Sequence, residues 1–420
     1  MKALSFLGAS RYQTVTYVWE GSSHTTSLFP EALARIFSPK EVIVFVTKTA
    51  RDYRPSEAEP TYTETLNQRL KGLIRFEDIP EGRSEAELWE IFDRVSGAVR
   101  EGETVILDIT HAFRSIPMIV FAVASYLRRT KNVNVERIVY GAFDAREPFR
   151  TPPQPQDRAP IFDLTPLLEL MDWTGGAEAL LKRGDAGLIA DKMIAAHQTL
   201  WRTGTGTPAR LKTLGQKLQD FSQALHLSRP REVMRTAHEL LSLLEEARDE
   251  FQRWALPFAL LAEQIRRELE PLAFAKPDAL SRENLERQVG LVEYYLRKGL
   301  VVQAITLARE WVVSFVLLYG GKEEWREGWL KHSNREEAEQ ALGAAAARRR
   351  GENAEPPEWF DRLSNKEELG ELWNKLGNLR NDLAHCAMRE NARSARAIEQ
   401  DAQKISQELR KLLDSAPDIV

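Results

Sequence analysis

The sequence has little of several features that would settle its class at once. Cys386 is the one cysteine among 420 residues, which excludes an intramolecular disulfide and a multi-cysteine zinc site and fits a reducing cytosol. No apolar run reaches the ~18 residues of a membrane span, so we expect a cytoplasmic protein without membrane contact. The net charge of −4 argues against general binding of long duplex DNA. GxGxxG and Walker motifs are absent, which argues against dinucleotide and nucleoside triphosphate sites.

The N-terminal part alternates strand and helix patterns. Residues 42–46 (Val-Ile-Val-Phe-Val) form an apolar run typical of a strand covered on both faces. The alternation predicts an α/β, Rossmann-like domain over residues 1–165. Thr14–Trp19 predicts a hairpin near the first strand, and the four prolines of residues 150–160 predict a stiff surface loop. The expected strands are Ala3–Leu7, Val42–Thr47, Leu73–Phe76, Thr104–Ile109 and Arg137–Ala142.

Polar residues follow two of these strands. Ligands of such sheets bind beyond the carboxyl ends of the strands. After the fourth expected strand, Ser115 looks like a helix N-cap and Pro117 lies in the first helical turn, so free backbone amides predict an anion site. An alternative, in which Asp108 and Thr110 only cap the turn, stays open. The residues expected to line the site are Gly8, Ala9, Ser10, Thr110, His111 and Arg114.

From about residue 166 the patterns are helical to the end of the chain. Residues 166–280 predict a helical connector, and residues 281–420 predict a helix bundle with short joints. The middle block contains histidines but no metal-ligand spacing, so we expect no metal site. Residues 344–357 are rich in alanine and end in glycine, asparagine and two prolines, which predicts a mobile loop. The predicted fold class is thus a Rossmann-like α/β domain followed by an all-α half.

One helical stretch, Lys366–Met388, carries residues suited to chemistry. Its leucines recur at three- and four-residue steps, which predicts one buried stripe. Asn381 and His385 fall opposite that stripe, and Arg380 flanks it. Histidine moves protons near neutral pH, and a guanidinium holds phosphate oxygens as charge develops on them. The pattern suits phosphodiester cleavage, but a polar helix face with a histidine is more often solvated surface, so the helix alone does not decide.

Together these residues resemble the CRISPR-associated CARF–HEPN ribonucleases, in the subgroup marked by an Asp-x-Thr-His-Gly loop. Asp108-Ile109-Thr110-His111 matches that loop, although Ala112 replaces the glycine, and Arg380-Asn381 with His385 matches the Arg-x4–6-His signature. The resemblance implies a CARF domain over residues 1–165 and a HEPN domain over residues 281–420.

The same resemblance implies an activity and partners. A homodimer would bind a cyclic oligoadenylate in its paired CARF domains. It would then cut single-stranded RNA in type III CRISPR antiviral defence, without a metal or other cofactor. The implied catalytic residues are Arg380, Asn381 and His385.

Three other functions fit parts of the pattern. The first is a ligand-sensing regulator that binds nucleic acid through its helices, but Arg231–Phe251 mixes acids and bases and offers no basic recognition face. The second is a hydrolase that uses Asp108 and His111, but no nucleophile elbow lies nearby. The third is a HEPN dimer that binds RNA without cutting it, which the sequence leaves open.

Overall fold

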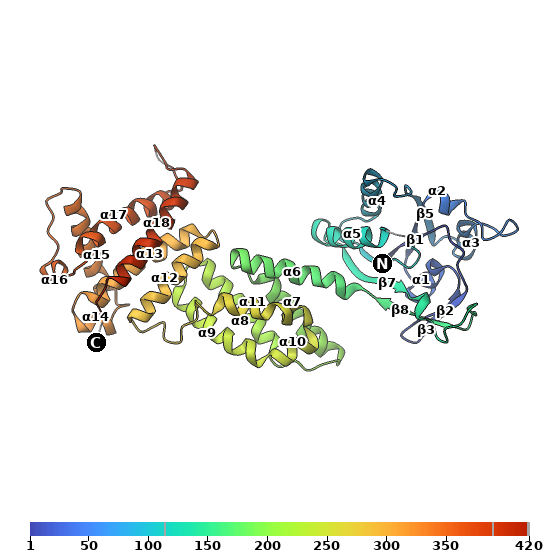
Figure 1. Cartoon of the computed structure of the whole chain (residues 1–420), viewed down its shortest axis with the longest axis horizontal. Helices are drawn as coiled ribbons and strands as arrows, with labels where there is room; N and C mark the ends of the chain where they lie inside the picture. Colours follow the sequence, from blue (N-terminus) through green and yellow to red (C-terminus); the bar gives the residue numbers. More distant parts are fainter. Residues whose placement is uncertain (113–114, 389, 418–420) are drawn as a thin grey trace. The chain divides into compact units, whose positions relative to one another are not determined.

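The structure is a computed structural model that describes residues 1–112, 115–388 and 390–417. The chain divides into two compact units, Met1–Met171 and Asp172–Val420 (Figure 1). The first unit holds an eight-stranded mixed sheet with helices, and the second is helical, so the predicted fold class is confirmed. The proposed division of the helical half at residue 280 stays a prediction.

The sheet of the first unit reverses its strand order at β1. The order is β3-β2-β8-β7-β6-β1-β4-β5, and β5, β4, β1, β6 and β7 are parallel. The chain adds β4 and β5 on one side of β1, then crosses to add β6 and β7 on the other, which creates the crevice where ligands of open α/β sheets bind. These strands are β1 (Lys2–Leu7), β4 (Glu41–Val46), β5 (Ile74–Asp78), β6 (Thr104–Asp108) and β7 (Asn134–Gly141).

The remaining strands correct two predictions. β2 (Val15–Trp19) and β3 (Ser22–Thr26) form the expected hairpin, but β2 pairs with β8 (Arg158–Asp163) and not beside β1. β8 itself was missed because Pro160 belongs to the proline-rich residues 150–160, which indicated a loop. Pro160 has no N–H to donate, yet its carbonyl accepts a 2.8 Å hydrogen bond from the Ala142 N–H, so the residue fits a ladder that needs only its oxygen.

Helices cover both faces of this sheet and enclose two apolar cores. One core packs α4 and α5 against β1, β4 and β6, and the other packs α1 and α3 against the opposite face. Ser115 is the N-cap residue of α5, as predicted, but its side chain makes no capping hydrogen bond. The helices are α1 (Phe29–Phe37), α2 (Lys48–Arg51), α3 (Tyr62–Arg69), α4 (Glu85–Gly97) and α5 (Ile116–Thr130), with a 3-10 turn at Phe143–Ala145.

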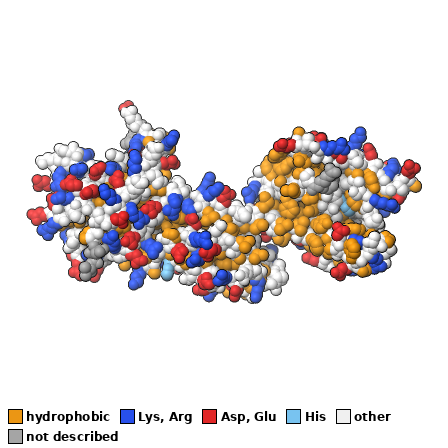
Figure 2. Space-filling view, viewed as in Figure 1, with side chains coloured by type: hydrophobic (Ala, Val, Ile, Leu, Met, Phe, Trp, Pro, Cys, Tyr) orange, Lys and Arg blue, Asp and Glu red, His pale blue; other side chains and the backbone are white. Residues whose placement is uncertain are grey.

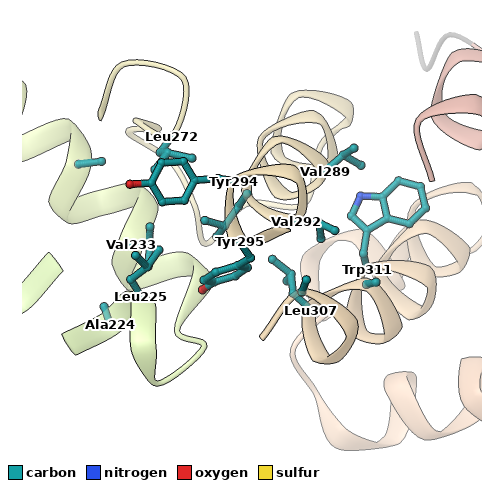
Figure 3. Packing of buried hydrophobic residues seen from close by; sticks show 14 of the residues in the cluster. Ala224, Leu225, Val233, Leu272, Val289, Val292, Tyr294, Tyr295, Leu307 and Trp311 are labelled. Atoms are coloured by element: carbon teal, nitrogen blue, oxygen red, sulfur yellow. The ribbon is translucent and has the colours of Figure 1, made fainter. Parts of the chain in front are cut away.

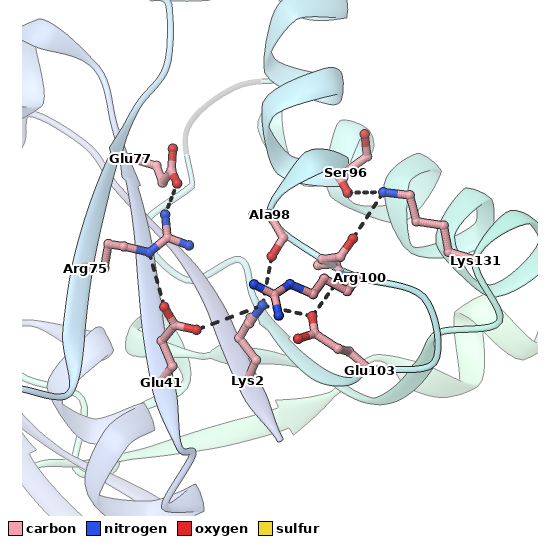
Figure 4. A network of polar contacts seen from close by, with 10 residues as sticks. Lys2, Glu41, Arg75, Glu77, Ser96, Ala98, Arg100, Glu103 and Lys131 are labelled. Atoms are coloured by element: carbon pink, nitrogen blue, oxygen red, sulfur yellow. Dashed lines mark hydrogen bonds and ion pairs between the residues drawn. The ribbon is translucent and has the colours of Figure 1, made fainter.

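Charged residues tie together the amino ends of the central strands (Figure 4). The Lys2 ammonium contacts Glu103 at 2.8 Å and Glu41 at 3.9 Å, and it donates to the Ala98 carbonyl at 2.9 Å. Lys131 donates to the carbonyls at the end of α4. This network fixes one edge of the sheet, and the predicted ligand residues lie at the opposite, carboxyl edge.

The second unit packs its helices around one continuous core that includes residues from Trp173 to Ala416. Tyr294 and Tyr295 of α12 are buried, and the Trp311 indole N–H of α13 donates to the Leu285 carbonyl at 2.9 Å (Figure 3). The helices are α6 (Thr165–Arg183), α7 (Gly187–Thr203), α8 (Leu211–His226), α9 (Pro230–Glu246), α10 (Arg248–Trp254), α11 (Leu256–Leu269), α12 (Arg282–Arg297), α13 (Val301–Tyr319), α14 (Glu323–Glu327), α15 (His332–Arg349), α16 (Glu358–Asp361), α17 (Lys366–Ala384) and α18 (Ala395–Asp414).

Two predictions in the helical half were wrong. Residues 344–349, expected in a mobile loop, form the last turns of α15, where Ala345 and Ala346 are buried against α17. α13 is long and apolar enough to pass for a membrane span, contrary to the expectation that no stretch would qualify. Of its apolar window, 67% is buried within the protein, since α13 is a central helix of the core.

Candidate functional site

A pocket of about 430 Å³ lies beyond the carboxyl ends of β1, β4, β5 and β6. We call it the switch-point pocket. Its volume lies within the range of small-molecule sites. Five of the predicted ligand residues meet there, and the loops after β4 and β5 add residues that the sequence patterns did not single out. The lining residues are Gly8, Ala9, Ser10, Tyr12, Thr47, Thr49, Glu81, Arg83, Thr110, His111 and Ala112.

The buried Asp108 holds the loop after β6 in place. This buried carboxylate accepts hydrogen bonds from the Ser5 hydroxyl at 2.5 Å and the Thr110 N–H at 2.7 Å. Burial raises the pKa of Asp108 to about 6, although these hydrogen bonds oppose the change. The Thr110 hydroxyl in turn accepts from the Gly141 N–H at 2.8 Å. Asp108 and Thr110 therefore stabilise the turn, as the alternative interpretation of the sequence expected. Thr110 also lines the pocket.

His111 is anchored as well. Its Nε2 accepts a 3.0 Å hydrogen bond from the Phe29 N–H, and its ring stacks on Tyr12 with centroids 3.8 Å apart. Burial lowers the pKa of His111 to about 3, against a hydrogen bond to the Ser27 backbone. The imidazole is therefore uncharged near neutral pH. It shapes the pocket wall and adds no positive charge for an anion.

Acceptors and donors face each other on the far side of the switch-point pocket. Glu81 accepts the Thr49 N–H at 2.9 Å. Burial alone would raise the pKa of Glu81, but hydrogen bonds from Thr49 and Thr47 and the charge of Arg83 hold it below its ordinary value. Arg83 is exposed at the pocket rim. The predicted ligand residue Arg114 lies outside the described residues.

The second candidate site lies at the end of α17. Arg380, Asn381 and His385 are exposed, while Leu376 and Leu379 are buried, so the helix presents these side chains to solvent as predicted. We call these three residues the α17 site. His385 is the C-cap residue, and its N–H donates to the Asn381 carbonyl at 3.0 Å. The backbone therefore places Asn381 and His385 one turn apart on a single helix end.

The guanidinium of Arg380 in the α17 site is available to bind an anion. Among the residues that the structure describes, the Arg380 side chain forms no hydrogen bond or ion pair. Within the same described ranges, no group of three or more His, Cys, Asp or Glu side chains is arranged to hold a metal ion. The arrangement provides an imidazole, an amide and a guanidinium, which are the groups needed to move a proton beside a phosphate.

Apolar side chains gather on the face of the N-terminal unit that Figure 2 shows, where α4 and α5 lie. The large exposed apolar residues of these two helices are Trp89, Met118 and Tyr126, with exposed fractions of 61%, 77% and 43%. Exposed apolar patches of this kind mark interaction surfaces. On the visible face of the helical unit, by contrast, positive and negative side chains are mixed.

Comparisons with known proteins match successive parts of the chain. Residues 2–144 match the family model described as the CARF domain of the CRISPR system endoribonuclease Csx1. Residues 169–271 match the second domain of the CRISPR-associated protein MJ1674. MJ1674 of Methanocaldococcus jannaschii is 27% identical over 201 residues, which are 47% of this chain and 28% of that protein. The match thus spans less than a third of this relative's length.

The chain is also similar to a solved structure. It is that of Enterococcus italicus Csm6 bound to cyclic hexa-2′-fluoro-hexa-dAMP, with 10% sequence identity and a TM-score of 0.42 over 98% of this chain and 93% of that one. The two family matches together lead to one conclusion. The N-terminal unit is similar to a CRISPR-associated CARF domain, and the helical segment after it is similar to the second domain of another CRISPR-associated protein.

Proposed function

We propose that this chain is an endoribonuclease that a cyclic oligoadenylate activates in type III CRISPR antiviral defence. The activator binds in the switch-point pocket of a homodimer, and the α17 sites of the two copies cut single-stranded RNA. The observation that carries this proposal is the exposure of Arg380, Asn381 and His385 together at one helix end. The family whose model matches residues 2–144 is described as a CRISPR system endoribonuclease, which supports it further.

The proposed reaction is attack of an RNA 2′-hydroxyl on the adjacent phosphorus, with release of the 5′-oxygen. His385 accepts or donates the proton, Arg380 stabilises the charge of the pentacoordinate phosphorus, and Asn381 orients the imidazole or the phosphate. One imidazole cannot serve as acid and base at once. A two-fold dimer supplies the second copy in the same cleft. The products carry 2′,3′-cyclic phosphate ends, and a chelator leaves the rate unchanged.

The dimer and the activator rest on features of the N-terminal unit. The apolar patch on α4 and α5 is a surface that a second copy can cover. A pocket at the strand-order reversal, with backbone amides and hydroxyls on its walls, suits the phosphates of a nucleotide ring. The ring activates because it binds the active arrangement of the dimer more tightly than the resting one.

Cleavage of a labelled single-stranded RNA with and without cyclic tetra-adenylate or hexa-adenylate tests the proposal. We expect one ring to accelerate cleavage and His385→Ala to abolish it, while dimerisation and ring binding stay intact. His238→Ala is the matched control because His238 is an exposed histidine of α9. RNA that stays whole with both rings, or full activity of His385→Ala, would contradict the proposal.

A further inference from the structure

A second arginine, Arg309 of α13, lies beside the α17 site in an unusual environment. Its guanidinium carbon sits 3.7 Å from the centre of the Trp373 indole, and its side chain is 25% exposed. Trp373 is buried and lies on α17, so the indole holds the guanidinium against that helix. Stacking on an aromatic face fixes the plane in which an arginine presents its donors.

The donors of Arg309 are nearly all unused. Among the described residues, its guanidinium donates no hydrogen bond, and its one ion pair is a 3.8 Å contact with Glu339 of α15. Arginine carries five N–H donors, and a half-buried side chain normally finds acceptors for them. A partly buried guanidinium that has no hydrogen-bond acceptor is suited to bind an anion.

The position of Arg380 adds to this. It lies seven residues after Trp373 on α17, hence two turns along the same face and about 10 Å up the helix axis. Burial lowers the pKa of Arg309; the carboxylate of Glu339 opposes this, and the positive charge of Arg380 lowers the pKa further. Two guanidinium groups without a hydrogen-bond acceptor thus lie near each other, and an anion between or beside them would relieve their repulsion.

We propose that Arg309 is an RNA-contacting residue that binds a phosphate of the substrate strand next to the one held by Arg380. This inference rests on the proposed ribonuclease function and deepens it. Trp373 acts as a positioning residue, because it is buried and contacts Arg309. The chain would therefore bind at least two consecutive phosphates at each α17 site, an arrangement that would favour an extended single strand.

The test measures RNA binding and RNA cleavage separately, with the full-length protein. Binding uses the His385→Ala background and an unstructured fluorescent RNA, with each cyclic oligoadenylate present in turn. Arg309→Ala should weaken binding by roughly tenfold or more and lower the slope of log affinity against log salt by about 0.7. Arg309→Lys should keep the slope but lose part of the affinity, since a lysine keeps the charge without the planar fork.

Cleavage supplies a second readout. In the otherwise unchanged chain, Arg309→Ala should raise KM more than it lowers kcat, because the contact exists before and during the reaction. Arg326→Ala is the control, since Arg326 is an exposed arginine of α14. If Arg309→Ala fails to fold, Arg309→Lys decides by the same two measurements. Wild-type affinity and salt slope in a folded Arg309 variant overturn the inference.

The two proposals fail in different ways. RNA that wild type leaves whole with both rings overturns the ribonuclease function, while an affinity that still depends on Arg309 supports the phosphate contact. Cleavage that needs His385 but is indifferent to Arg309 overturns only the inference drawn here.

Discussion

At the scale of single residues, the switch-point pocket is built by side chains that are already engaged. Thr110 accepts from Gly141, and His111 accepts from Phe29. Gly141 has no room for a side chain, since a Cβ there would lie 2.5 Å from the Phe29 ring. We therefore expect the ligand to contact the exposed Ser10 and the pocket residues of the loops after β4 and β5. The loop after β6 forms a rigid wall of the pocket.

Asp108 gives a pH-dependent prediction. Its folded pKa of about 6 lies above the ordinary 3.8, so the folded chain holds a proton that the unfolded chain has released between these values. The stability that Asp108 contributes is therefore lost as the pH rises through that window. Between pH 4 and pH 7, the free energy of unfolding of Asp108→Asn should rise by up to about 3 kcal/mol relative to that of wild type. Hydrogen exchange of β1 and β6 amides at several pH values measures this difference.

Wild type must be compared with Asp108→Asn because His111 changes the stability with pH in the opposite direction. Its lowered pKa means that stability is lost as the pH falls below about 6.5. Wild type and Asp108→Asn share this effect, so it cancels in their difference. A difference that stays constant over the whole range would show that Asp108 does not titrate in the folded chain as expected.

Sequence patterns located the pocket residues that follow recognisable strands. Gly8, Ser10 and Thr110 stand directly after apolar runs, so their place at the sheet edge could be predicted. Glu81 could not, because two residues separate it from β5 and its role depends on the Thr49 amide of another loop. Arg309 was hidden for a similar reason. It interrupts an apolar helix, and only the fold brings Trp373 to it.

At the scale of elements, the end of α17 is strained. Cys386 and Ala387 follow the helix with φ values of +50° and +58°, a region that side chains other than glycine adopt at a cost. The Ala387 N–H nevertheless donates to the Asp382 carbonyl at 3.2 Å, which closes the helix end. The helix thus ends at His385, and the strained backbone of the next two residues forms this helix end.

Ala387→Gly should therefore stabilise the helical unit by roughly 0.5–1 kcal/mol, since glycine reaches positive φ without a Cβ clash. The matched control is Ala384→Gly, one turn earlier and helical, which should destabilise by a similar amount. Denaturant titrations of the three proteins measure both changes. Equal shifts in the same direction for the two variants would show that backbone conformation at residue 387 is not the cause.

Elements with strong local patterns were predictable, and those defined by distant partners were not. The parallel strands are continuous apolar runs, and α17 carries its leucine stripe, so both follow from local sequence. β8 exists because β7 and β2 pair with it on either side, which Pro160 and the prolines before the strand conceal. The last turns of α15 are helical since Ala345 packs against Gly370 of α17, a contact that no local pattern reveals.

At the scale of the whole molecule, the proposed mechanism needs two chains for one cleft. Differently tagged wild-type and His385→Ala chains can be co-expressed and their mixed dimers isolated by two affinity steps. We expect the mixed dimer to cut RNA at well below half the wild-type rate, because acid and base come from different copies. Independent sites would give half the rate, which would contradict a shared cleft.

The single cysteine has a practical consequence for following all of these steps. Cys386 is exposed and adjoins His385, and the sequence has no other thiol to compete for a label. A maleimide dye would attach to this one position without any cysteine being removed first. Its emission, or energy transfer between the dyes of two subunits, would then follow the arrival of a transcript at the helix end in real time.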